Sequence, residues 1–421
     1  MKQQQNFLSG EVILGFLLPP ILGVPFLFFN YIKNKKRHVL IAFLMVYTLL
    51  TLYCFPYYDP NIFFFSAISD NISFQGHALN GVANVFRQLF HIDVYFSFGI
   101  YFFFSIFFYF KSLDYYSGYK RKNLLFIIAI LSMPIDAWTN TFYIPLALSF
   151  FLFWGEKYKK SIKLLVLGAY ISSIIHTVAF LIIFPAIIIY LLARKEKYIL
   201  FYSFIVIYLI VMWFFFHGYA ESFFVLLGDN ELVINKIQMY TDIEGVWGGV
   251  GLKKGPIGRI VQTLSYCLFA YNLILISLNR SKMKSYFVTY LYIIGCINIL
   301  CSFHLFTFNQ RFCIVNIMFS VAISFILYQS NKAIIYKSIF VFTLLLSYVL
   351  PFLHYHGSMK HDLFDSEESY YNISTQVFYT PSVLLVANFS NKGWNDTYMC
   401  QHAIWGQNIY FNPNKRLKYL W

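Results

Sequence analysis

The chain has 421 residues, of which 59% are hydrophobic, 22% aromatic and only 12% charged, and its mean hydropathy is +0.60. A soluble domain carries about 25% charged residues and about 45–50% apolar ones. One soluble core cannot hide 50 Phe and 35 Tyr residues without leaving large apolar patches on its surface. The composition therefore argues against a soluble enzyme, a disordered tail or a secreted disulfide scaffold, and it predicts a polytopic membrane protein.

About twenty apolar residues cross a bilayer as a helix, because an unsatisfied backbone amide is too costly in lipid. Scanning at that length predicts about twelve transmembrane helices, of which the fourth and sixth are short. They cover residues 11–31, 38–55, 93–110, 123–134, 138–154, 162–175, 177–192, 198–216, 260–278, 286–305, 312–327 and 335–353. The first lacks the basic start and the small-residue cleavage site of a signal peptide. The expected fold is all-α, with a transmembrane domain at 1–353 and an extracytoplasmic C-terminal tail or small cap at 354–421.

Orientation follows from the Lys and Arg residues, which recur in alternate loops. One side of the predicted membrane holds 20 basic and three acidic residues, and the other holds 12 and 15, a split of +17 against −3. Cytoplasmic loops attract Lys and Arg, so the basic side is predicted to be cytoplasmic and both termini extracytoplasmic. Because the basic residues lie between apolar runs rather than on a polar domain, the net charge of +14 does not indicate nucleic-acid binding.

No cofactor is expected from the sequence. The predicted cytoplasmic loops are too short for a nucleotide-handling domain, and the glycine-rich run at 245–255 has the wrong spacing for a phosphate loop and falls outside. The six cysteines form no CxxC pair, which argues against a zinc site or a disulfide framework. His354, His356 and His361 in the tail are predicted to lie in a solvated segment rather than in a metal site.

Ionisable residues near the hydrocarbon region are costly and are often functional. Five lie at predicted external span ends, and they are His176, Arg311 beside Gln310, Arg87 beside Gln88, Asp59 beside Tyr58, and Asp136. Each also has a purely structural explanation. Arg and His residues at span ends reach toward lipid headgroups or form hydrogen bonds between helices, and Asp residues often begin turns. Because all five residues fall on the same predicted membrane face, together they favour a functional site. Arginines clamp diphosphates, and a carboxylate or imidazole removes a proton from a sugar hydroxyl, which together indicate chemistry on a lipid-linked phosphate.

With these residues in view, the chain resembles the Wzy/EpsG-type polysaccharide repeat-unit polymerases. Four short motifs within the first 330 residues carry the resemblance: Tyr57-Tyr58-Asp59, Thr139-Asn140-Thr141-Phe142, His176-Thr177-Val178-Ala179 and Arg311-Phe312. The family tends to place Arg-Gln soon after the Asn of the second motif, where this chain has Tyr143-Ile144. Arg87 and Gln88 occur earlier, and whether they fill that role is open.

The resemblance implies an enzyme of the bacterial cytoplasmic (inner) membrane, a glycosyltransferase that joins undecaprenyl-diphosphate-linked oligosaccharides outside the cytoplasm by inverting or retaining transfer. Arg311 and Arg87 would hold the departing diphosphate, and His176 or Asp59 would be the general base. Gln88, Asn140, Gln310, Tyr58 and Asp136 would complete the substrate site. Besides membrane lipids, the implied partners are a chain-length regulator and a flippase.

Two alternatives remain open. A lipid-linked oligosaccharide flippase often shows two related halves and charged residues buried mid-membrane, and the sequence has no convincing internal repeat. Another integral-membrane transferase, such as an O-antigen ligase or a sugar O-acetyltransferase, is the second. An acetyltransferase needs access to a cytoplasmic acyl donor, and no polar set on that side is evident to receive one.

Overall fold

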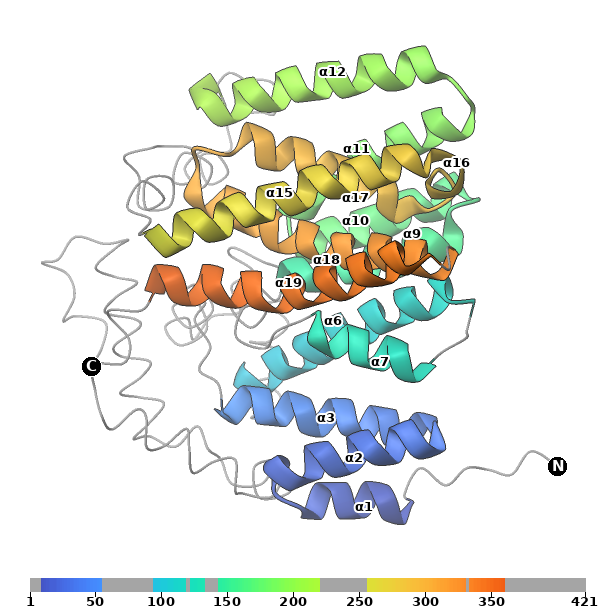
Figure 1. Ribbon diagram of the computed structural model, residues 1–421, viewed down its shortest axis with the longest axis vertical. Coiled ribbons are helices and arrows are strands. Elements are labelled where there is room, and N and C mark those ends of the chain that lie inside the picture. The colour runs from blue at the N-terminus through green and yellow to red at the C-terminus, as the bar shows by residue number, and fades with distance from the viewer. Residues whose placement is uncertain are drawn as a thin grey trace, which may run out of the picture.

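The computed structural model describes residues 9–54, 94–118, 122–132, 143–219, 256–330 and 333–359. All of the regular structure in these ranges is helical, which confirms the predicted all-α class for the described part of the chain. The helices lie side by side and alternate in direction, so that successive turns fall at opposite ends of the bundle (Figure 1).

The elements follow the predicted spans closely after residue 140. Before that point they are α1 (Gly10–Leu17), α2 (Pro20–Asn34), α3 (Arg37–Cys54), α6 (Val94–Tyr116) and α7 (Lys122–Leu131). The later elements are α9 (Tyr143–Tyr158), α10 (Ile162–Ile175), α11 (Val178–Arg194), α12 (Tyr198–Phe214), the π-helix η1 (Phe215–Tyr219), α15 (Pro256–Leu278), α16 (Arg280–Met283), α17 (Phe287–Cys301), α18 (Phe306–Ser330) and α19 (Ile334–Met359).

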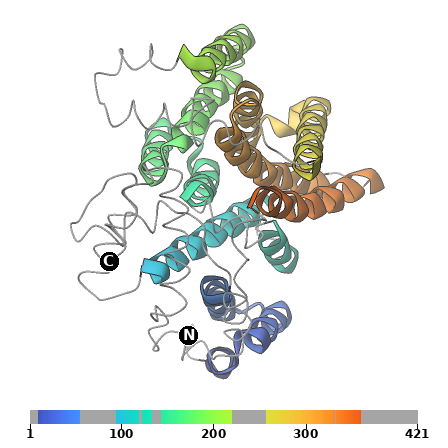
Figure 2. The same ribbon diagram turned by 90° about the vertical axis from the view of Figure 1, so that its left-hand side faces the viewer.

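Three of the described helical segments are long and apolar enough to cross a membrane. They are Tyr198–His217, Arg259–Leu278 and Phe308–Ser330. The first lies at the edge of the bundle and the last is central, since it packs against α9, α15, α17 and α19 (Figure 2). The long apolar helices support the membrane-protein character that the composition predicts.

The N-terminal region differs from the prediction of one span over residues 11–31. The chain instead forms a hairpin of α1 and α2, which run antiparallel (Figure 1). Leu18 and Pro19 separate them in extended conformations, because a residue that precedes proline disfavours the helical region and Pro20 is itself suited to begin a helix. The hydropathy scan missed this break because Leu and Pro residues do not interrupt an apolar run.

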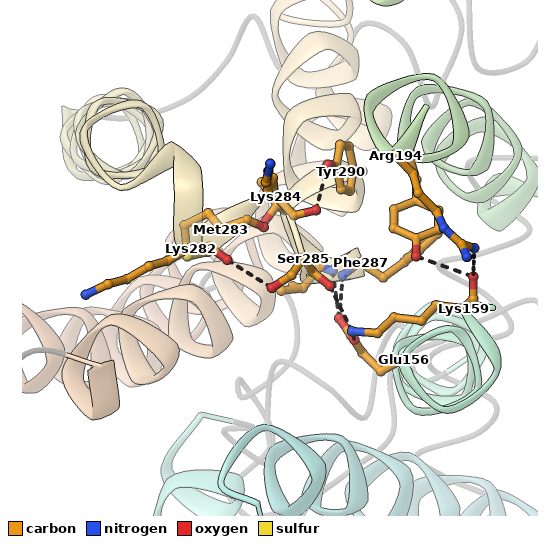
Figure 3. A network of polar contacts seen from close by, with 12 residues as sticks. Glu156, Lys159, Arg194, Lys282, Met283, Lys284, Ser285, Phe287 and Tyr290 are labelled. Atoms are coloured by element: carbon orange, nitrogen blue, oxygen red, sulfur yellow. Dashed lines mark hydrogen bonds and ion pairs between the residues drawn. The ribbon is translucent and has the colours of Figure 1, made fainter. Parts of the chain in front are cut away.

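A polar network joins the basic loops at one end of the bundle, which is on the right in Figure 1. Lys159 Nζ donates to the carbonyl of Ser285 at 2.8 Å, and the Lys159 carbonyl accepts from Tyr190 Oη at 3.3 Å and Arg194 Nη1 at 3.4 Å (Figure 3). The segment after α9, the last turns of α11 and the segment after α16 therefore lie together. Because Lys and Arg residues gather here, we name it the basic end of the described bundle.

The interior of the bundle contains neutral polar groups that bond helices to one another. Pro185 in α11 has no N–H, so the carbonyl of Leu181 loses its usual helical donor. That carbonyl instead accepts from Tyr208 Oη of α12 and, at 3.1 Å, from Asn298 Nδ2 of α17. Tyr208 Oη also lies 2.9 Å from Asn298 Oδ1. The Leu181 carbonyl, which Pro185 leaves without its helical donor, thus links α11, α12 and α17 by hydrogen bonds.

Candidate functional site

The candidate site lies at the end of the bundle opposite the basic end. Here α10 turns into α11, α12 runs into the π-helix η1, α15 begins, and α17 turns into α18 (Figure 1). The sequence predicts this end to be extracytoplasmic. His176, Gln310 and Arg311 are the predicted site residues that fall within the described ranges, and all three lie at this end.

His176 occupies the turn between α10 and α11 and is 5% exposed. Its backbone N–H donates to the carbonyl of Ser172, which closes α10, and its Nδ1 accepts from the backbone N–H of Val178 at 3.1 Å. A ring nitrogen that accepts carries no proton, so the neutral ring holds its proton on Nε2. In this geometry Nε2 of His176 is a hydrogen-bond donor. It thereby suits an anionic oxygen better than it suits proton removal.

The start of α18 is fixed by hydrogen bonds around Asn309, a side chain 1% exposed. Asn309 Oδ1 lies 3.0 Å from Gln262 Nε2 and 2.9 Å from Tyr266 Oη, both from α15. Asn309 Nδ2 donates to the carbonyl of Ile299 in α17 at 3.0 Å. Three helices are therefore bonded at one residue, and this holds the first turns of α18 in place.

Gln310 and Arg311 follow directly on that anchored turn and are both partly exposed. A helix advances about 100° per residue, so these two residues lie on other faces of α18 than the buried Asn309. The hydrogen bonds of Asn309 therefore hold the backbone that carries Arg311. Arginine in such a position is suited to bidentate recognition of phosphate.

A cluster of aromatic rings and histidines lies at the same end. The His217 ring stacks on the Trp213 ring with centroids 4.0 Å apart. The centroid of the His304 ring also lies 4.0 Å from that of His217, with the two rings tilted. His304 Nε2 bonds to the carbonyl of Phe216 and His217 Nδ1 to that of Trp213, each at 2.8 Å. Since carbonyls only accept, both rings donate there. The π-helix thus joins the end of α12 to the turn before α18.

Gln262, Tyr266 and Asn309 are not among the residues that the sequence predicts for the site. The available signal was the polarity of Gln262 and Tyr266 within the predicted span 260–278, because polar groups at membrane depth usually find partners, whereas Asn309 lies between two predicted spans. The pairing itself was not readable, since Gln262 and Asn309 are 47 positions apart. The other predicted site residues lie outside the described residues, namely Asp59, Tyr58, Arg87, Gln88, Asn140 and Asp136.

Within the described ranges, no group of three or more His, Cys, Asp or Glu side chains is arranged to hold a metal ion. The tail histidines from 361 onward fall outside these ranges. Comparison with known proteins adds no identity, because no protein family, curated protein or solved structure matches the chain.

Proposed function

We propose that this chain is a membrane glycosyltransferase that joins lipid-diphosphate-linked oligosaccharides, with about twelve helices in the membrane and the site facing away from the cytoplasm. The observation that carries the proposal is the position of Arg311 in α18, two residues after the buried Asn309 whose hydrogen bonds join three helices, at the end opposite the basic loops. A cytoplasmic position of the basic end follows from the positive-inside rule. Arg311 then meets the outer leaflet, where a lipid-linked diphosphate has its headgroup.

The proposed reaction needs no nucleotide sugar, because the lipid diphosphate is the leaving group. A hydroxyl oxygen of the acceptor sugar attacks the anomeric carbon of the donor, and the bond from that carbon to the phosphate oxygen breaks. Arg311 and the Nε2–H of His176 stabilise the negative charge that develops on the diphosphate. The hydroxyl proton passes to a general base, a role that the His176 geometry leaves to the Asp59 carboxylate.

Loss of the gene tests the reaction class. If the chain is a polymerase, the deletion strain accumulates single repeat units on their lipid carrier at the outer leaflet. Loss of a flippase instead traps those units on the cytoplasmic leaflet, and loss of a ligase leaves long chains on the lipid. Either of the last two results contradicts the proposal.

Point variants test the site. Arg311→Ala and His176→Ala are expected to abolish chain extension while the protein still inserts, and Arg311→Lys should retain a small part because a lysine cannot bind bidentately. Arg280→Ala is the matched control, because Arg280 lies at the basic end with its guanidinium over the Tyr198 ring at 4.7 Å. Full-length glycan ladders from both site variants would overturn the assignment.

A further inference from the structure

The α1–α2 hairpin is held by an ion pair and by close backbone packing. Lys36 Nζ lies 2.8 Å from Glu11 Oε1, and Asn34 Nδ2 lies 3.4 Å from the same oxygen. Farther along the hairpin, a Cβ atom placed on Gly23 would lie 2.7 Å from the Gly15 carbonyl oxygen. The start of α1 therefore lies beside the turn that follows α2, and that turn carries the first basic run at residues 33–37.

Neither helix of the hairpin is long enough to cross a bilayer. At 1.5 Å per residue, the 8 residues of α1 extend about 12 Å and the 15 residues of α2 about 22 Å. The hydrocarbon core is about 30 Å thick. The tip at Leu18 and Pro19 therefore falls inside the hydrocarbon when the 33–37 turn lies at a membrane surface.

The tip is suited to that depth because it has few backbone donors to leave unsatisfied. Pro19 and Pro20 have no N–H, and Leu18 N–H donates to the Leu14 carbonyl at 3.0 Å. The carbonyl of Pro19 accepts from Leu22 at 2.8 Å and from Gly23 at 2.7 Å. Non-helical backbone at membrane depth is tolerated where the protein buries it, and here Leu18 and Pro19 are partly buried and Pro20 is buried.

We propose that α1 and α2 form a re-entrant hairpin, which enters and leaves the membrane on the side of the basic loops and contacts the acyl chains of that leaflet. The proposal rests on the membrane topology of the proposed function. The hairpin carries exposed apolar side chains, which are Ile13, Leu14, Leu17, Ile21 and Leu22. Lys33 and Lys35 at its open end face the anionic headgroups of the same leaflet.

The hairpin changes the predicted topology without changing the charge count. The start of α1 moves from the extracytoplasmic to the basic side, which leaves α3 as the first helix to cross. Lys2 and Glu11 move together, so the split stays at +17 and −3. The positive-inside rule therefore has no means of separating the two arrangements, and only the geometry does so.

Single cysteines at three positions test the proposal in the full chain with its six native cysteines replaced. Ser9→Cys marks the start of α1, Lys35→Cys marks the basic end, and Phe303→Cys, 53% exposed, marks the opposite end. A membrane-impermeant maleimide is applied to intact and to permeabilised cells. The hairpin predicts that positions 9 and 35 label from one side and position 303 from the other.

The outcomes separate the hairpin from the function proposed for the chain. Labelling of positions 9 and 303 from one side, with 35 on the other, overturns the hairpin and leaves the proposed function intact. Labelling of positions 9 and 35 from outside, with position 303 labelled from the cytoplasmic side, supports the hairpin and overturns the orientation of the proposed site. Labelling of 35 and 303 from the same side overturns both.

Cross-linking is a second measurement for the case in which the cysteine-free chain does not insert. Glu11→Cys and Lys36→Cys are introduced together into the otherwise unchanged chain and treated with a short bis-maleimide, with each single variant as control. The hairpin predicts a new intramolecular cross-link in the double variant only. One continuous helix would separate the two positions by about 38 Å, so absence of the link at full labelling of both cysteines would overturn the hairpin.

Discussion

The Glu156 carboxylate at the end of α9 accepts the backbone N–H of Phe287 at the start of α17 (Figure 3). It also lies 3.4 Å from the N–H of Val288 and 3.0 Å from Lys159 Nζ. Glu156 is fully buried, and that burial raises the pKa of its carboxyl, while Lys159 and the two backbone donors act in the opposite direction. The contact joins α9 to α17 through two residues that are 131 positions apart. The backbone N–H groups at the start of α17, which have no partner within the helix, thereby receive an anionic cap.

Removal of this carboxylate is expected to destabilise the fold. Glu156→Ala leaves the α17 donors and Lys159 without their buried acceptor, at a cost of about 3–5 kcal/mol. Glu156→Gln keeps one carbonyl oxygen for the Phe287 N–H and should lose clearly less. Thermal unfolding in detergent measures the order. The control is Glu196→Ala, because Glu196 forms an exposed pair with Lys284 at 3.9 Å and should change stability by less than about 1 kcal/mol. Equal losses in Ala and Gln would contradict the cap.

Tyr208→Phe tests the bond to the carbonyl that Pro185 leaves open. Loss of the hydroxyl leaves Asn298 as the remaining donor to Leu181, and the expected cost is about 1–2 kcal/mol. In a Pro185→Ala background the helix supplies its own N–H to Leu181, so the same substitution should cost less. The difference is a double-mutant coupling, read from unfolding midpoints. Tyr202→Phe, on the exposed face of α12, is the control and should be neutral. Identical costs in both backgrounds would refute the link to Pro185.

Gly295→Ala tests the close contact between α17 and α18. A Cβ atom at this position would overlap Asn316 Oδ1, and Asn316 is fully buried. Overpacking of this kind costs about 1–3 kcal/mol. Asn316→Ala in the same chain should relieve most of the overlap, so the double variant is expected to be more stable than the sum of the single losses allows. Gly10→Ala is the control because no atom lies within 4 Å of its added Cβ. Additive losses would show that the two residues do not interact.

His304 predicts a loss of stability in acid. It lies in the turn between α17 and α18, where burial and then the charge of His217 lower the pKa of its ring below 6.5, against the opposing bond to Phe216. The unfolded chain therefore takes up a proton first. The stabilisation is full above about pH 6.5 and is lost as the pH falls toward the lowered folded pKa.

The measurement is the unfolding midpoint at pH 7.5 and at 5.5, compared with His304→Gln. Glutamine keeps a donor for the Phe216 carbonyl but does not titrate, so the difference between the two pH values should shrink. The remaining histidines are common to both chains and cancel in the comparison. An unchanged difference would rule out His304 as a contributor.

The apolar runs predicted most helices because length and hydropathy suffice for an isolated span, as for α12, expected at 198–216 and observed at Tyr198–Phe214. Hydropathy failed at Pro19 and Pro20, since a single proline is accommodated inside α2 and α11, and an adjacent pair breaks the helix. Polarity singled out His176, yet its tautomer depends on the N–H of Val178 and required the turn geometry. Asn309 needed its partner on α15, which no local pattern provides.

The central position of α18 also bears on how the protein is made. Its neighbours α9, α15 and α17 precede it in the chain, whereas α19, which covers another of its sides, is synthesised afterwards. In a nascent chain that has released α18 but not α19, the side of α18 that α19 covers is therefore not yet packed. Biogenesis then passes through an incomplete bundle, and α19 closes it only after the ribosome has finished α18.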